Sequence, residues 1–473
     1  MYKVFYNLCK EHLSEELEKV EKMPQGGSER QYFRLFLKNS KTVLGVFNPN
    51  MSENEAFVKL QGVFQKQNLP VPVIFGVDKS KQYYLCSDNG KNTLFDLIKK
   101  DEAGNLEKSA YEYFEQSIKY LTRFQTSFIK EPNIFEYCSV PKEFDRRSIM
   151  WDLNYFKYNF LKVRSVPFNE IALEDDFEKL SSKIASIPMQ GFMYRDFQSR
   201  NIMIDEGKLV FIDFQGGRRG PFQYDVVSLL WQALAELSEQ DKENLIKSYI
   251  IELQKILPKS QEYFYRDLNE IILLRLLQVL GAYGFRGLIE RKSHFIKSLP
   301  SGIKQLVNHW ESTDLGKKYP ELNSCIDFIN KQQEHQQHKI KTTGLTINIC
   351  SFSYANGSYP IDLSGHGGGY VFDCRGLQNP GRIEGYKHLT GKDKKVIDYM
   401  RLYGEVESFI NSAYQIVEKH ATLYESQGYV YLSVAFGCTG GRHRSVYCAE
   451  EVAKRLEFNG FNVHLWHREF PTI

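Results

Sequence analysis

Two short apolar runs on either side of a polar turn mark the middle of the chain. Residues 201–204 (Asn-Ile-Met-Ile) and 209–212 (Leu-Val-Phe-Ile) have the length and composition of buried strands, and residues 205–208 (Asp-Glu-Gly-Lys) suit the turn between them. The pattern therefore predicts a β-hairpin. Asn201 begins the first strand and Asp213 follows the second, so the hairpin would bring both polar side chains to one place.

The N-terminal part of the chain has the pattern of a sheet with one helix. A small-residue turn that begins at Gly26 leads into an alternating strand that ends at Leu37, and a helix is expected from Glu53 to Gln67. A mostly helical region follows, and this order is the layout of a two-lobed α+β kinase with ATP between its lobes. The other expected strands and the hinge-like turn are Thr42–Phe47, Val71–Val77, Tyr83–Cys86 and Ser87–Gly90.

Beyond residue 344 the pattern changes to a strand, a glycine-rich loop and a helix. The strand is expected at Tyr429–Phe436, the loop at Gly437–Ser445 and the helix at Val446–Phe458. Such a loop directs backbone N–H groups and the positive end of the helix dipole to one place, which is an anion site. The guanidinium of Arg444 can add a bidentate clamp on a phosphate group.

The composition is that of a folded protein with more than one domain: 473 residues, 42% hydrophobic and 25% charged. The net charge of +3 indicates no dominant field for nucleic acid or membrane, and no export signal or membrane-spanning run is expected. The eight cysteines lack paired spacing, which predicts reduced thiols and a cytoplasmic location. A polar linker, residues 331–344, separates the expected domains 1–330 and 345–473.

Three oxygen-bearing side chains point to phosphoryl transfer. Protein kinases carry H-R-D-x-x-x-x-N followed by D-F-G, and Asp196, Asn201 and Asp213 keep this pattern. Tyr194 replaces the histidine and Gln215 replaces the glycine. We expect Asp196 to be the catalytic base that accepts the proton of the attacking hydroxyl, and Asn201 and Asp213 to hold Mg²⁺ against ATP. A hairpin with solvated carboxylates is the alternative.

The nucleotide phosphates need positive partners. A kinase normally carries a lysine on its third strand, but residues 44–48 (Leu-Gly-Val-Phe-Asn) supply none. Arg30 or Arg34 is the candidate replacement, and a solvated strand charge is the alternative for each. The turn of the first hairpin can lay backbone N–H groups over the phosphates, from Gly26, Gly27 and Ser28. For the glycines alone, an ordinary hairpin turn is the favoured alternative.

Three charged residues follow the expected metal strand. Asp225 is expected to brace the catalytic loop rather than to react. Arg218 and Arg219 either touch phosphate or belong to a surface turn, and the residues alone leave both possibilities open.

Four segments match a family of small-molecule kinases: Gly26–Arg34, Ser148–Phe156, Tyr224–Leu230 and Arg275–Arg286. Through them residues 20–310 resemble the aminoglycoside phosphotransferase-like kinases, and within these the N-acetylmuramate/N-acetylglucosamine anomeric kinases. The resemblance implies the aminoglycoside phosphotransferase fold. It also implies ATP- and Mg²⁺-dependent phosphorylation of a hydroxyl on a small amino sugar of cell-wall metabolism.

The glycine-rich loop admits two chemistries. Cys438 and Arg444 have the C-x5-R spacing of the tyrosine phosphatases, where the cysteine is a nucleophilic thiolate. The residues alone leave open whether the loop binds a phosphate or cleaves a phosphate ester.

Three segments of the second domain share another resemblance: Tyr370–Pro380, Leu389–Asp393 and Gly437–Val446. Residues 346–468 resemble the C-terminal domain of the RNase adapter protein RapZ, although the P-loop domain of that family is absent here. The resemblance implies that the domain binds glucosamine 6-phosphate and contacts small RNA. The positions that it assigns to the ligand pocket are Asp373, Arg375, Cys438, Thr439, Gly440, Gly441, His443, Arg444 and Ser445.

The sequence thus predicts an amino-sugar kinase fused to a domain that binds a phosphorylated amino sugar. Two alternatives stay open. One is a regulatory adapter that binds nucleotide, phosphosugar and small RNA; the other is a Cys-dependent phosphatase in the second domain. RNA is not favoured, because residues 344–473 hold 13 Lys+Arg and 13 Asp+Glu, a net charge of zero.

Overall fold

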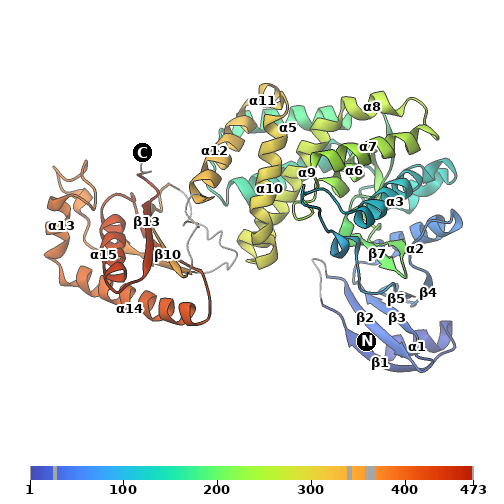
Figure 1. The fold of residues 1–473 in the computed structure, drawn as a ribbon, viewed down its shortest axis with the longest axis horizontal. Helices are drawn as coiled ribbons and strands as arrows, with labels where there is room; N and C mark the ends of the chain where they lie inside the picture. Colours follow the sequence, from blue (N-terminus) through green and yellow to red (C-terminus); the bar gives the residue numbers. More distant parts are fainter. Residues whose placement is uncertain (1, 25–28, 338–343, 357–359, 361–368, 471–473) are drawn as a thin grey trace. The chain divides into compact units, whose positions relative to one another are not determined.

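A computed structural model describes residues 2–24, 29–337, 344–356, 360 and 369–470 (Figure 1). The chain divides into two compact units, each made of three segments. The division differs from the boundary expected at residues 331–344, which stays a prediction. The first unit consists of Met1–Leu153, Glu174–Leu277 and Asn308–Leu315, and the second of Asn154–Leu173, Gln278–Val307 and Gly316–Ile473.

The first unit begins with an antiparallel sheet of five strands in the order β1-β2-β3-β5-β4. Helix α1 (Tyr2–His12) buries Phe5 and Leu8 against this sheet. Helix α2 (Met51–Lys66) follows β3 and is capped by Asn50, whose side chain accepts a hydrogen bond from the Glu53 N–H. The strands are β1 (Leu17–Lys22), β2 (Gln31–Leu37), β3 (Thr42–Phe47), β4 (Ile74–Val77) and β5 (Tyr83–Ser87).

Two small antiparallel sheets carry the catalytic motif. Strands β7 (Ile202–Asp205) and β8 (Lys208–Phe211) form the predicted hairpin, in which Ile202 lies opposite Phe211. Strands β6 (Gln190–Met193) and β9 (Arg218–Pro221) form the other pair. The chain segment between β6 and β7 and the segment after β8 therefore converge, and these segments hold the expected base and metal ligands.

Helices dominate the chain between residues 108 and 337. One helical segment, Leu268–Ile289, has the length and apolar composition of a membrane span, although the sequence pattern predicted none. Ile271, Leu273 and Leu277 are fully buried in this segment, as in the core helix of a folded domain. The helices are α3 (Lys108–Gln125), α4 (Arg146–Phe156), α5 (Glu170–Ala185), α6 (Gln223–Leu230), α7 (Glu239–Gln254), α8 (Ser260–Arg266), α9 (Leu268–Tyr283), α10 (Ser293–Glu311), α11 (Leu315–Lys318) and α12 (Pro320–Gln337).

The last part of the second unit is built on a parallel sheet of order β11-β12-β10-β13. Because the strands are parallel, their carboxyl ends meet at one edge, where ligands bind in open α/β sheets. The strands are β10 (Thr346–Ser353), β11 (Gly369–Asp373), β12 (Tyr431–Cys438) and β13 (Asn462–His467), and the helices are α13 (Lys394–Arg401), α14 (Gly404–Ser426) and α15 (Arg444–Phe458).

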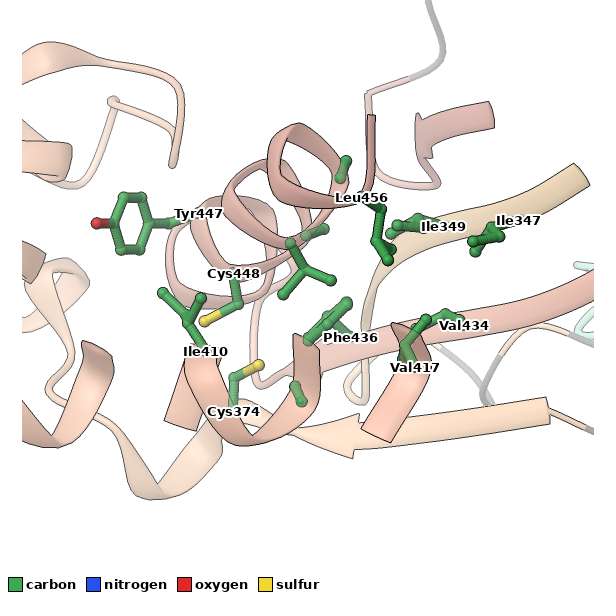
Figure 2. Packing of buried hydrophobic residues seen from close by; sticks show 14 of the residues in the cluster. Ile347, Ile349, Cys374, Ile410, Val417, Val434, Phe436, Tyr447, Cys448 and Leu456 are labelled. Atoms are coloured by element: carbon green, nitrogen blue, oxygen red, sulfur yellow. The ribbon is translucent and has the colours of Figure 1, made fainter. Parts of the chain in front are cut away.

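The core of this part lies between the sheet and its helices. Figure 2 shows Ile349 and Phe436 of the sheet packed with Leu456 of α15, and the sulfur atoms of Cys374 and Cys448 facing each other. All eight cysteines of the chain are free and buried. The predicted fold class is confirmed: a two-lobed kinase-like part is followed by an α/β part with a strand–loop–helix anion motif.

Candidate functional site

The expected catalytic loop follows β6 and is held by a buried carboxylate. Asp225 accepts hydrogen bonds from the backbone N–H groups of Tyr194 (2.8 Å) and Arg195 (2.9 Å) and from the Gln125 side chain (3.1 Å). Burial raises the pKa of Asp225 to about 7, and these N–H groups oppose the rise. Arg195 has a φ of +78°, a conformation that non-glycine residues rarely adopt. The bracing role expected for Asp225 fits these contacts.

The three residues of the expected catalytic motif lie together. The Asn201 side-chain amide donates to the backbone carbonyl of Asp196 at 2.9 Å and lies 3.4 Å from the Asp213 carboxylate. The backbones of the two strands are also linked here, because the N–H of Ile212, the residue before Asp213, donates to the Asn201 carbonyl at 3.0 Å. The hairpin thus brings the two expected metal ligands to one place, beside the expected base.

Asp213 has an unusual backbone conformation, and its buried carboxylate lies near both a cation and another carboxylate. Its φ is +70°, which is outside the region that most residues adopt. The Gln215 amide donates to its Oδ1 at 2.6 Å, and Arg30 Nη1 lies 3.7 Å from the same oxygen. Burial raises the pKa of Asp213 and the charge of Asp196 raises it further, whereas Gln215 and Arg30 oppose the rise. A nearby cation would favour the ionised carboxylate.

The oxygen ligands fit Mg²⁺. Asp213 supplies a carboxylate, and no described residue donates a hydrogen bond to Oδ1 of Asn201, so this oxygen is available as well. Mg²⁺ at phosphate sites uses one or two protein ligands and takes its remaining oxygens from phosphate and water. Within the described part of the chain, no three His, Cys, Asp or Glu side chains form a metal cluster.

The two candidate arginines have different partners. Arg30 is only 4% exposed, contacts Glu53 of α2 at 3.3 Å and faces Asp213. Arg34 instead makes a bidentate pair with Asp88, at 2.6 and 3.0 Å, and donates to the Gly90 carbonyl. Arg30, and not Arg34, is therefore placed at Asp213, the expected metal ligand. The other three expected phosphate contacts lie outside the described residues: Gly26, Gly27 and Ser28.

Several residues of this site had no role in the sequence interpretation. Arg195 forms a bidentate pair with Asp152 of α4, both distances being 2.9 Å. Glu53 and Gln215 hold Arg30 and Asp213, as described above. The Arg195–Asp152 and Arg30–Glu53 contacts join residues 43 and 23 positions apart, so no local pattern could reveal them, whereas Gln215 lies only two residues after Asp213. Only the family match of Ser148–Phe156 marked the segment that holds Asp152.

In the C-terminal sheet, the expected ligand residues gather at the carboxyl edge. The register aligns Asp373 of β11 with Gly437 of β12, and Ser353 of β10 with Cys438. The Asp373 carboxylate makes a bidentate pair with Arg375, with distances of 2.7 to 3.0 Å. These hydrogen bonds hold the pKa of Asp373 below its ordinary value. Asp373 is thus an ionised partner of Arg375 and is poorly suited to act as an acid.

The loop after β12 has the form of an anion nest. No described residue accepts a hydrogen bond from the backbone N–H groups of residues 440–446, and the N-terminus of α15 adds its dipole. Gly441 has a φ of +63°, and a Cβ there would lie 2.4 Å from the Glu469 side chain. Gly391 packs equally closely, because a Cβ would lie 2.4 Å from the Tyr447 N. Only glycine fits either position.

Arg444 and Cys438 have partners within the protein. Arg444 is 5% exposed, and its Nη1 donates to the backbone carbonyls of Arg375 (2.7 Å) and Leu377 (3.1 Å). Its Nη2 lies 3.4 Å from Thr439 Oγ1. Cys438 Sγ lies 3.1 Å from Ser445 Oγ. Arg444 therefore ties the Asp373–Arg375 turn to the glycine-rich loop, a role that the expected phosphate clamp did not include.

Three further features of this edge were missed. His443 Nε2 contacts the Tyr386 carbonyl at 3.0 Å, and burial lowers the pKa of this histidine. The Arg375 guanidinium lies 4.1 Å from the centre of the Tyr354 ring, a cation–π contact. Glu469 accepts from the Ser353 N–H at 3.0 Å. None of these partners is near the loop in sequence.

The expected base and the two expected oxygen ligands lie together at a hairpin in a two-lobed fold, which is the arrangement of a kinase-like phosphotransferase. The chain belongs to the phosphotransferase enzyme family, whose model matches residues 19–258. Solved structures similar to this chain include choline kinase LicA from Streptococcus pneumoniae, with 14% identity, a TM-score of 0.43, and coverage of 65% of this chain and 99% of that one. Macrolide 2'-phosphotransferase MphH from Brachybacterium faecium matches with 9% identity, a TM-score of 0.43, and coverage of 63% and 97%.

The second match is to the RapZ C-terminal domain, over residues 345–471. A protein of Acidobacterium capsulatum named nucleotide-binding protein is 33% identical over 196 residues, which cover 39% of this chain and 62% of the relative. A protein of Koribacter versatilis with the same name is 38% identical over 136 residues, which cover 29% and 41%. The chain thus spans less than two thirds of the length of either relative.

Proposed function

We propose that the chain is an ATP- and Mg²⁺-dependent kinase of a small amino sugar, with a C-terminal domain that binds a phosphorylated amino sugar. The kinase domain would comprise residues 1–330 and the binding domain 345–473, joined by the linker 331–344. The contacts of Asn201 with both Asp196 and Asp213 carry the kinase proposal. A cytoplasmic location is part of the proposal, and RNA is not the favoured partner.

Each residue has a separate task in this proposal. Asp196 orients the acceptor hydroxyl and takes its proton. Asn201 and Asp213 hold Mg²⁺, which neutralises charge on the triphosphate when it is bound. Arg30 takes the place of the missing strand lysine: it is buried, paired with Glu53 of α2 and directed at Asp213. Protein kinases use a comparable pair, between a lysine on the third strand and a glutamate of a helix.

The amino-sugar acceptor rests on two independent resemblances that point to the same metabolism. The first is to kinases of N-acetylmuramate and N-acetylglucosamine, and the second is to a domain that binds glucosamine 6-phosphate. The nest at residues 440–446 and the dipole of α15 support phosphate binding in the second domain. The pairing of Asp373 with Arg375 favours binding over hydrolysis, because it keeps the expected candidate acid in its ionised form.

An ATP-consumption screen of the purified full chain over a panel of amino sugars tests the proposal. We expect turnover with one or a few sugars, dependent on Mg²⁺. Tight binding of ATP without turnover on any sugar would favour the regulatory adapter instead. Phosphate release from glucosamine 6-phosphate that is lost in Cys438→Ser would favour the phosphatase, for which the Cys438–Ser445 contact is the supporting observation.

A further inference from the structure

Arg218 and Arg219 are adjacent in β9 but face different surroundings. β9 pairs antiparallel with β6, so that Arg218 lies opposite Met193 and Arg219 opposite Phe192. Met193 is three residues before Asp196. Because successive side chains of a strand point to opposite faces, only one of the two arginines can face the catalytic loop.

Arg219 has ordinary surface partners. Its guanidinium lies 4.0 Å above the Phe135 ring and 3.7 Å from the Glu143 carboxylate. Its side chain is 42% exposed. These contacts explain Arg219 as a partly exposed surface charge. Arg219 therefore serves as the matched control for Arg218.

Arg218 lies beside the catalytic loop. Its Nε donates to the Gly216 carbonyl at 3.2 Å, and a Cβ on Gly216 would lie only 3.8 Å from Asp196 Oδ2. No described carboxylate forms an ion pair with Arg218, and its two Nη groups donate to no described residue. The guanidinium thus keeps its outer donors available next to the proposed base.

The surroundings of Arg218 already contain a second cation. Arg195 is neutralised by its bidentate pair with Asp152. Burial lowers the pKa of the Arg218 guanidinium and the charge of Arg195 lowers it further, whereas Tyr224 and the charges of Asp152 and Asp196 oppose the fall. A half-buried cation without a carboxylate partner is costly, and an anion that enters the site would remove that cost.

We propose that Arg218 contacts the phosphoryl group while it is transferred, as an arginine supplied by the chain itself. The inference rests on the proposed kinase function. In the transfer, the acceptor oxygen forms a bond to the γ-phosphorus and its proton passes to Asp196. The bond from the γ-phosphorus to the bridging oxygen breaks, and ADP leaves. A guanidinium at this position stabilises the charge on the oxygens of the transferred group.

The test compares Arg218→Met with Arg219→Met in the full chain. The acceptors are neutral N-acetylglucosamine and N-acetylmuramate, which carries a carboxylate. We expect Arg218→Met to lower kcat about 1,000-fold or more with each reactive acceptor, because arginines of this kind contribute that much to phosphoryl transfer. The Kd for ADP and the KM for the sugar should stay unchanged, and Arg219→Met should behave like the wild type.

Two results would overturn the inference, and a second variant covers a failure to fold. Unchanged kcat in a folded Arg218→Met protein overturns it. A raised KM for N-acetylmuramate alone, with kcat preserved, places Arg218 on the acceptor carboxylate and also overturns it. If Arg218→Met does not fold, Arg218→Lys gives the same readout, with a loss of kcat expected because lysine cannot reproduce the planar fork.

The inference can fail separately from the proposed function. If neither sugar reacts with the wild type, the acceptor assignment is wrong. Hydrolysis of ATP by water still measures Arg218 in that case, since water replaces the hydroxyl as acceptor. Slower hydrolysis in Arg218→Met but not in Arg219→Met supports the inference, and equal rates contradict it.

Discussion

The hydroxyl of Tyr194 donates a hydrogen bond of 2.6 Å to the backbone carbonyl of Ile212. Tyr194 stands where protein kinases have the histidine of the catalytic loop, and Ile212 precedes the proposed metal ligand Asp213. The tyrosine is fully buried, with its ring against Phe124 and Phe197. Tyr194 thus links the loop of the proposed base directly to the strand that precedes the proposed metal ligand.

Removal of this link should loosen the site without abolishing it. In Tyr194→Phe the Ile212 carbonyl loses its partner, which costs about 1 kcal/mol of stability. We expect a lower kcat with little change in nucleotide Kd, measured by steady-state kinetics and calorimetry. Tyr120→Phe, in which a ring that packs on Phe211 loses its hydroxyl, is the control. Equal kinetics of the two variants would show that the link has no effect on catalysis.

The two proposed metal ligands should differ in importance. Asp213→Ala removes a charged ligand and Asn201→Ala a neutral one, so we expect the larger rise in nucleotide Kd for Asp213→Ala, about tenfold or more. Calorimetry with Mg²⁺ and with chelator separates metal-dependent binding from the rest. The metal assignment is wrong if both variants bind Mg-ATP like the wild type.

In the second domain, Arg444→Ala should remove calorimetric binding of glucosamine 6-phosphate by the full chain. The variant loses a positive charge and the bonds to the Arg375 and Leu377 carbonyls that shape the loop. Cys438→Ser should weaken binding far less, because a hydroxyl keeps the contact with Ser445. Arg455→Ala, on the same helix but paired with Glu407, is the control. Full binding by Arg444→Ala would remove this loop from the ligand site.

Glu450 provides a prediction for the pH dependence of stability. His467 Nε2 and Lys392 Nζ both lie 3.1 Å from its carboxylate, and these contacts lower its pKa from 4.5 to about 2. A lowered pKa stabilises the folded protein above the ordinary pKa, and this contribution is lost as the pH falls from about 4.5 towards 2.

Glu450→Gln should therefore lower Tm at pH 7, with a cost of about 3 kcal/mol at most, and the difference from wild type should shrink between pH 4.5 and 2. Thermal unfolding followed by circular dichroism measures both effects. Glu451→Gln, whose side chain pairs with Lys454, is the control. A difference that stays constant down to pH 2 would contradict the charge argument.

Much of the fold could be predicted from local pattern. The hairpin β7–β8, strand β3 and the strand–loop–helix unit of β12 and α15 follow from apolar runs bounded by turns. Strand β1 could not be predicted, because only Leu17 of its six residues is buried and the rest are mostly charged. It is a strand because it pairs with β2, which is a tertiary effect.

Only the part of the site that depends on the spacing of residues along the chain could be predicted. The convergence of Asn201 and Asp213 follows from a hairpin of known length. The choice of Arg30 over Arg34 depends on Asp88, which lies 54 residues after Arg34 and captures its guanidinium. The carbonyl partners of Arg444 lie 67 and 69 residues before it, so its structural role had no local signal.

The most direct test of the account is Asp196→Asn in the full chain. The amide keeps the shape of the side chain but cannot accept the proton of the acceptor hydroxyl. We predict loss of sugar-dependent ATP turnover, with nucleotide binding in the presence of Mg²⁺ close to that of the wild type. Turnover at the wild-type rate by this variant would contradict the assignment of the base, and with it the proposed kinase mechanism.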